Sequence, residues 1–132
     1  TGVLAAPDII VFTSTAGANA SGTTFGQADV ITNFTVGVDK LQFSTADVVS
    51  AQQAAVQTAV TALTAGSTAT QIATAMATAN TTALGVSFAV FEGNTYVLYE
   101  TIAASTGVAA DDVFIKLTGV TMLPTFAVDV IA

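Results

Sequence analysis

The chain has 132 residues, of which 52% are hydrophobic and only 8% charged, and its formal net charge is −7. This length fits one domain with a core of its own. An acidic surface repels phosphate backbones and lacks the basic clusters that anionic membranes attract, so we expect no binding to nucleic acid or to membrane surfaces. No run of about 18 apolar residues is present, so no membrane-spanning helix is expected.

Most catalytic chemistry is excluded because the chain contains no His, Cys or Arg. Serine–histidine triads, cysteine–histidine pairs and zinc sites built from His or Cys cannot form. A pair of carboxylates remains. However, Glu92 and Glu100 are expected far apart along one hairpin, and Asp111 and Asp112 on opposite faces of an extended segment. We therefore expect that this domain is not an enzyme.

The N-terminal third predicts three short strands. Residues 8–13 form an apolar, β-branched run that is typical of a buried strand. Residues 14–27 are rich in Gly, Ser, Thr, Ala and Asn and predict a loop. Residues 30–35 and 41–44 predict two more strands, and residues 37–40 supply the turn between them.

The pattern becomes helical at residue 50. Residues 50–53, Ser-Ala-Gln-Gln, match a capping box, and so do residues 68–71, Thr-Ala-Thr-Gln. Hydrophobic residues then recur at helical spacing. We predict two helices, at about residues 50–65 and 68–80, with Gly66 ending the first. Because both are rich in Thr, packing on a sheet must stabilise them more than helix propensity does.

Strand signals return after the helices. Residues 86–92 and 95–101 flank Gly93-Asn94, which is a signal for a two-residue hairpin loop. Residues 113–117 alternate in character and predict a half-buried strand. Residues 126–131 predict a last strand.

These elements together predict an α+β fold, because strands lie on either side of a helical insert. We expect a mostly antiparallel sheet or sandwich with a two-helix insert at about residues 50–80. Residues 1–132 are expected to form a single domain. The chain begins without Met and shows no N-terminal signal peptide, so we expect a fragment of a longer protein.

Three blocks of sequence follow one another in an order that resembles a known family. They are residues 8–12 (DIIVF), residues 29–44 (DVITNFTVGVDKLQFS) and residues 112–120 (DVFIKLTGV), the last continuing to residues 129–131 (DVI). This order is similar to that of the C-terminal domain that follows the calcium-binding repeats of RTX proteins, including serralysin-type metalloproteases. The glycine- and aspartate-rich repeats of that family are not present in this chain.

The resemblance implies export by a type I secretion apparatus through an uncleaved C-terminal signal, and hence an extracellular or cell-surface location. Signals of that family often end in an acid followed by apolar residues. Asp129, Val130, Ile131 and Ala132 have this form, and they are the secretion signal that the resemblance implies. The alternative is that these residues are simply the last strand of the sheet.

The Ala-, Thr- and Val-rich, Lys-poor composition looks like that of surface-layer (S-layer) proteins or large adhesins that leave the cell by this route. We therefore expect a non-enzymatic C-terminal domain of an S-layer-like bacterial surface protein, serving export and surface assembly. Beyond the secretion apparatus, the partners considered are a second copy of the chain and cell-surface polysaccharide. Two alternatives stay open, namely an adhesin or carbohydrate-binding module, and the tail of a secreted RTX metalloprotease or other hydrolase.

Calcium is the metal that the residue types favour, because it prefers carboxylate and carbonyl oxygens. The candidate ligands are Asp29, Asp39, Asp111 and Asp112, which occupy predicted strand ends and turns. Asp29 with Asp39 is the best pair. The alternative is that each aspartate caps its own turn through side-chain hydrogen bonds.

Overall fold

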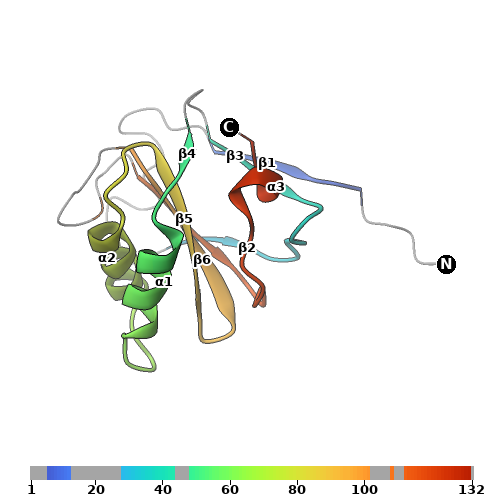
Figure 1. Cartoon of the computed structure of the whole chain (residues 1–132). Helices are drawn as coiled ribbons and strands as arrows, with labels where there is room; N and C mark the ends of the chain where they lie inside the picture. Colours follow the sequence, from blue (N-terminus) through green and yellow to red (C-terminus); the bar gives the residue numbers. More distant parts are fainter. Residues whose placement is uncertain (1–5, 13–27, 44–47, 102–107, 109–111, 132) are drawn as a thin grey trace.

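Figure 1 shows the protein as a computed structural model that describes residues 6–12, 28–43, 48–101, 108 and 112–131. Over these residues the chain forms eight strands and three helices. In chain order they are β1 (Ile9–Phe12), β2 (Asp29–Ile31), β3 (Lys40–Phe43), β4 (Val49–Ser50), α1 (Gln53–Thr61), α2 (Ala69–Ala79), β5 (Gly85–Phe91), β6 (Asn94–Glu100), β7 (Val113–Leu117), α3 (Phe126–Asp129) and β8 (Val130–Ile131). Within the described ranges, no helix has the length and hydropathy needed to cross a membrane.

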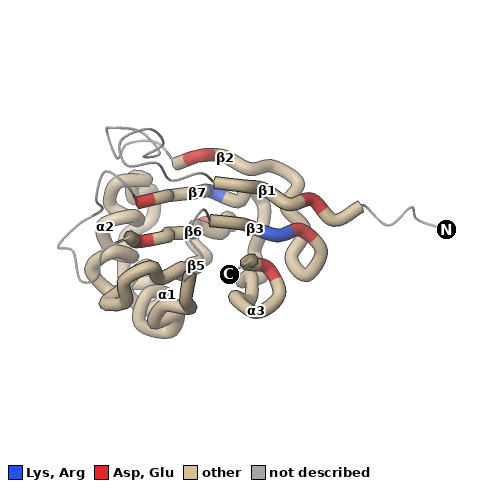
Figure 2. The backbone as a smooth tube through the Cα atoms, turned by 90° about the horizontal axis from the view of Figure 1, so that it is seen from above, with Lys and Arg blue, Asp and Glu red and all other residues tan. Residues whose placement is uncertain are grey.

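The strands form two sheets. A parallel sheet has the order β1-β3-β8, and a mixed sheet has the order β2-β7-β6-β5-β4. The two sheets pack face to face, and α1 and α2 cover the other face of the mixed sheet (Figures 1 and 2). The mixed sheet is therefore the middle of three layers.

The predicted α+β class is confirmed, but a mostly antiparallel sheet is wrong. Four of the six strand pairings are parallel, and only β5–β6 and β6–β7 are antiparallel. The reason lies in the turn at residues 35–39. It does not fold β2 and β3 into a hairpin but sends them to different sheets. The chain thus runs from the parallel sheet to the mixed sheet and back, so that β3 returns parallel to β1.

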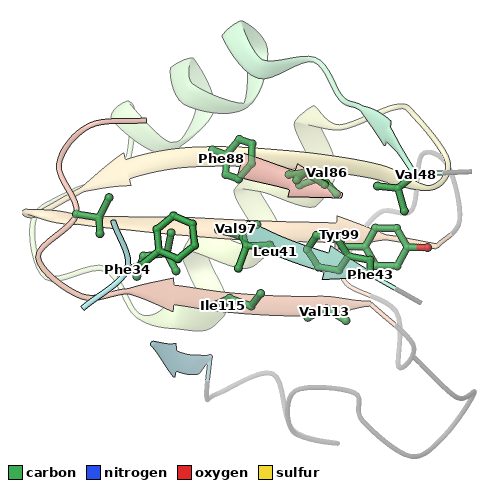
Figure 3. Close-up of a cluster of buried hydrophobic side chains, with 13 residues drawn as sticks. Phe34, Leu41, Phe43, Val48, Val86, Phe88, Val97, Tyr99, Val113 and Ile115 are labelled. Atoms are coloured by element: carbon green, nitrogen blue, oxygen red, sulfur yellow. The ribbon is translucent and has the colours of Figure 1, made fainter. Parts of the chain in front are cut away.

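Hydrophobic side chains form two cores, one on each face of the mixed sheet. Between the sheets lie side chains such as Leu41, Val97 and Tyr99 (Figure 3). Between the mixed sheet and the helices lie Tyr96 and Phe114, among others. The strand at residues 113–117 was predicted to be half-buried, yet Phe114 is buried as well because the helices cover its face.

Stacked aromatic rings join the two sheets. The ring of Phe43 in β3 lies 4.9 Å, between centroids, from the ring of Tyr99 in β6, and 5.7 Å from that of Phe12 in β1. Such offset stacks add to the stability that burial of apolar area provides. This row connects the edge of the parallel sheet to the centre of the mixed sheet.

The first helix differs from its prediction. Ser50 belongs to β4 rather than to a capping box, and the N-cap residue Gln52 makes no side-chain capping bond. The helix ends at Thr61, so Gly66 lies beyond its C-terminus. The strand pairing of β4 holds residues 49–50 extended, and this tertiary constraint overrides the local capping signal.

Two glutamines of α1 pair with the backbone of β5. The Gln53 side chain accepts the N–H of Phe88 at 2.9 Å and donates to the carbonyl of the same residue. One turn later, Gln57 accepts from the N–H of Val90 at 2.8 Å and donates to its carbonyl at 3.1 Å. The two amides therefore occupy the edge of β5 beyond the short strand β4, as a neighbouring strand would.

The second helix matches its prediction closely. Its N-cap is Thr68, whose hydroxyl accepts from the N–H of Gln71, while the Gln71 side chain accepts from the N–H of Thr68. The capping box predicted at residues 68–71 is confirmed. Ile72 and Met76 are among the residues that this helix buries.

The hairpin loop and the last segment differ in detail. Phe91 pairs with Asn94, so the loop is Glu92-Gly93 rather than Gly93-Asn94. Both loop residues have positive φ, 46° and 75°, as a type I′ turn requires. Residues 126–129 form a short helix instead of a strand, and only Val130 and Ile131 continue as β8.

Burial of Tyr96 predicts a loss of stability at high pH. Burial raises the pKa of the Tyr96 phenol above its ordinary 10.0, and the Glu92 carboxylate adds to the shift. The folded state holds this proton more tightly than the unfolded state. The stability that the protonated phenol contributes is therefore complete below pH 10 and is lost as pH rises through the folded pKa. The free energy of unfolding of the wild type, measured by urea denaturation, should therefore fall more steeply above pH 10 than that of Tyr96→Phe. Equal pH dependence of the two proteins would contradict this assignment.

Candidate functional site: the aspartates around the turn at residues 35–39

The turn between β2 and β3 is closed by its own backbone. The N–H groups of Val38 and Asp39 both donate to the carbonyl of Thr35, at 3.1 and 2.9 Å. Gly37 has a φ of +82°, in the left-handed region that other residues enter with strain. The Gly-x-Asp sequence at residues 37–39 is therefore needed for the shape of this turn.

Asp39 completes the turn and fixes the start of β1. Its side chain is 5% exposed. One carboxylate oxygen accepts the N–H of Thr35 at 2.7 Å, and the other accepts the N–H of Asp8 at 3.0 Å. Asp8 in turn accepts the N–H of Lys40 through its carbonyl at 2.8 Å. One carboxylate thus connects the turn to a segment 31 residues earlier in the chain.

Asp129 reaches the same turn from the last described segment. It is completely buried. One carboxylate oxygen accepts the N–H of Gly37, and the other accepts the N–H and the hydroxyl of Thr125, at 2.6 and 3.3 Å. Nearby, the Lys40 ammonium donates to the carbonyl of Val128 at 2.7 Å. These bonds attach the C-terminal segment to a turn 92 residues away in sequence.

The chemistry of this site is that of a scaffold. A buried carboxylate is costly unless donors satisfy it, and charge-assisted bonds to backbone N–H groups are among the stronger hydrogen bonds in proteins. Asp39 and Asp129 each accept at both oxygens, so the two side chains organise three backbone segments around one turn. Asp129, predicted as part of a secretion signal, and Asp39, predicted as a calcium ligand, thus act on the same turn.

The other two described calcium candidates lie elsewhere. Asp29 is exposed at the start of β2, opposite Ile115 in the mixed sheet, whereas Asp39 directly precedes β3 of the parallel sheet. Asp112 is buried and accepts the N–H and the hydroxyl of Thr101, at 2.9 and 3.2 Å. Asp111 lies outside the described residues.

The remaining signal residues continue the sheet. Val130 is buried and pairs with Leu41, and Ile131 pairs with Gln42. Ala132 lies outside the described residues.

Two acidic residues lie side by side in the sheet, which the sequence pattern did not indicate. The β6–β7 register places Tyr99 opposite Val113, so the next pair along the strands is Glu100 and Asp112. Both carboxylates are buried on the face that the helices cover. On its other side, Glu100 pairs with Gly85 of β5. One feature of the sequence could have indicated this pair. Glu100 is an acid at the end of an alternating row that is otherwise hydrophobic, Tyr96 and Leu98.

Among the residues that the structure describes, no three acidic side chains come together as a group that could hold a metal ion. Comparison of the chain with protein-family models, with curated proteins and with solved structures finds no match.

Removal of the Asp129 carboxylate should strongly destabilise the fold. Asp129→Ala leaves the N–H groups of Gly37 and Thr125 without their acceptor, and a bond to a charged group contributes about 1.5–3 kcal/mol. We expect a loss of roughly 3–5 kcal/mol in the free energy of unfolding, measured by urea denaturation. The matched control, Asp29→Ala at an exposed position, should change it by no more than about 0.5 kcal/mol. A loss below about 1 kcal/mol in Asp129→Ala would contradict the scaffold role.

The calcium hypothesis has a separate test at Asp29. If Asp29 and Asp39 share a calcium ion, millimolar calcium should raise the thermal unfolding midpoint, because a ligand that binds only the folded state stabilises it. Asp29→Asn should then abolish that increase while leaving the midpoint in EDTA unchanged. An unchanged midpoint of the wild type in calcium would refute the hypothesis.

Proposed function

We propose that this chain is a non-enzymatic domain of a type I-secreted, S-layer-like bacterial surface protein, with residues 129–132 as its export signal. The single observation that carries the proposal is that strand pairing joins all three blocks of the RTX-like sequence. β1 of the first block pairs with β3 of the second. β2 of the second pairs with β7 of the third, and β3 pairs with β8 at the end of the third.

All of these pairings are parallel, and none involves the helices. The described residues between the second and third blocks form α1 and α2 together with β4, β5 and β6. Both helices lie on the face of the mixed sheet that is turned away from the parallel sheet. This arrangement supports a common structural unit made by the three blocks, with the helical insert added on one side.

Burial of the proposed signal indicates when it would be read. Asp129 is completely buried, and Val130 packs in the core between the sheets. A secretion apparatus cannot contact these side chains in the folded domain. The proposal therefore requires that residues 129–132 are read while the chain is unfolded, and that folding outside the cell then buries Asp129 and Val130.

The structure gives little support to the alternative of a carbohydrate-binding module. Aromatic platforms for sugars need exposed rings, and both tyrosines of the chain are buried, Tyr96 under the helices and Tyr99 between the sheets. Export to the cell surface is thus the function that we propose, with the type I secretion apparatus as the partner.

The experiment must separate a lost signal from a lost fold. Deletion of residues 129–132 removes both β8 and the proposed signal, so export of this variant by a type I system should fall to background. The control is Leu41→Ala, which leaves the signal intact but removes a fully buried side chain that pairs with Val130, at a cost of about 2–5 kcal/mol. We expect Leu41→Ala to be exported at close to the wild-type level, measured as protein in the medium.

Wild-type export of the deletion variant would refute the signal. Loss of export in both variants would show that folding stability, rather than residues 129–132, limits export.

A further inference from the structure

Three triplets of the form Asn-x-Ser/Thr occur in the chain, at residues 19–21, 33–35 and 80–82. This triplet, with any residue but Pro in the middle, is the acceptor sequence for attachment of a sugar to the Asn side chain. The triplet at residues 19–21 lies outside the described residues. The structure allows the other two to be compared for access to a modifying enzyme.

The triplet at residues 33–35 presents both of its recognised side chains to solvent. Asn33 and Thr35 are exposed, whereas Phe34 between them is 7% exposed and belongs to the core between the sheets (Figure 3). The buried ring therefore fixes the middle of the triplet while the amide and the hydroxyl stay accessible. Asn33 has a φ of +68°, in the left-handed region that Asn tolerates better than most residues do.

The backbone of Thr35 is part of the turn described above. Its N–H donates to the Asp39 carboxylate at 2.7 Å, and its carbonyl accepts from the N–H groups of Val38 and Asp39. These bonds all use main-chain atoms of Thr35. A change of the Thr35 side chain therefore leaves them in place.

The triplet at residues 80–82 is closed to a modifying enzyme in the folded chain. Asn80 is completely buried. Its side-chain oxygen accepts the N–H of Thr82 at 2.9 Å, and its NH₂ group donates to the carbonyl of Gly85 at 3.5 Å. Attachment of a sugar to Asn80 would require this amide to leave both partners. Burial therefore separates two triplets that look alike in the sequence.

We propose that Asn33 is a site of N-linked glycosylation in the folded protein. The second substrate is a sugar whose anomeric carbon is bonded to a diphosphate leaving group. The amide nitrogen of Asn33 forms a bond to that carbon, the bond from the carbon to the diphosphate oxygen breaks, and the amide proton passes to a base of the transferase. Nothing is oxidised or reduced. The proposal does not depend on the export function.

The composition and the position of Asn33 both suit a sugar. Only 8% of the residues are charged, so hydroxyl and amide groups must hydrate most of the surface, and a bulky, hydrophilic sugar adds to them. The strand β2 ends at Ile31, before Asn33, and its pairing with β7 ends there as well. A sugar on Asn33 thus leaves the pairing of the mixed sheet intact.

Mass spectrometry of the protein from the cells that produce it tests the proposal. Cleavage before aspartate releases residues 29–38 as a peptide whose only Asn is Asn33. This peptide should carry the mass of a sugar, and the size of the added mass distinguishes a single sugar from a preassembled oligosaccharide. The peptide that contains Asn80 should be unmodified.

Two substitutions of Thr35 form a matched pair for the same measurement. Thr35→Val removes the hydroxyl but keeps a β-branched side chain of similar shape, and it should abolish the modification of Asn33. Thr35→Ser keeps the hydroxyl and should retain the modification. Urea unfolding of both variants shows that each still folds, so that a loss of the sugar reports on the hydroxyl alone.

An unmodified Asn33 in the wild-type protein would overturn the proposal, and so would equal modification of Thr35→Val and Thr35→Ser. A sugar on Asn80 as well as on Asn33 would also overturn it. Transfer would then take place on the unfolded chain, and the fold would not select the site.

Discussion

The carboxylates of Asp39 and Asp129 meet around one turn, and the arrangement of both sheets depends on it. This turn directs β2 and β3 into different sheets, and the parallel pairings of β1 with β3, β2 with β7 and β3 with β8 all require that separation. Gly37 gives this turn conformational freedom in the unfolded chain. Two buried acceptors, Asp39 just before β3 and Asp129 in the last segment, compensate for that freedom, because each one binds two backbone N–H groups that would otherwise need water.

Burial of the mixed sheet on both faces sets the second constraint. Its central strands β6 and β7 alternate between the two cores, so that Val97 and Tyr99 face the parallel sheet while Tyr96 and Leu98 face the helices. A sheet of this kind needs a cover on each side. Since α1 and α2 carry no charged residue, ion pairs cannot hold them in place. The apolar core beneath them and the Gln53 and Gln57 bonds to β5 do so instead.

Local signals in the sequence predicted local structure well, and long-range structure less well. The capping box at Thr68 and Gln71 is complete within four residues, and it forms as predicted. An equally good match at Ser50 fails because residues 49–50 pair with β5. The hairpin loop lies at Glu92-Gly93, one residue earlier than predicted. The Glu92 side chain accepts a hydrogen bond from the N–H of Gly66, and this contact between distant residues cannot be predicted from a local pattern.

Strand direction was the largest error, and its cause is general. Alternation and β-branching show that a segment is extended but do not show which strand it joins. The segments on either side of Gly37 were predicted as two strands joined by a turn, and the strands that they pair with come from residues 8–12, 113–117 and 130–131. For the site, the sequence identified Asp39 and Asp129 individually. Their convergence on one turn depends on a contact across 92 residues, so it could not be read from spacing.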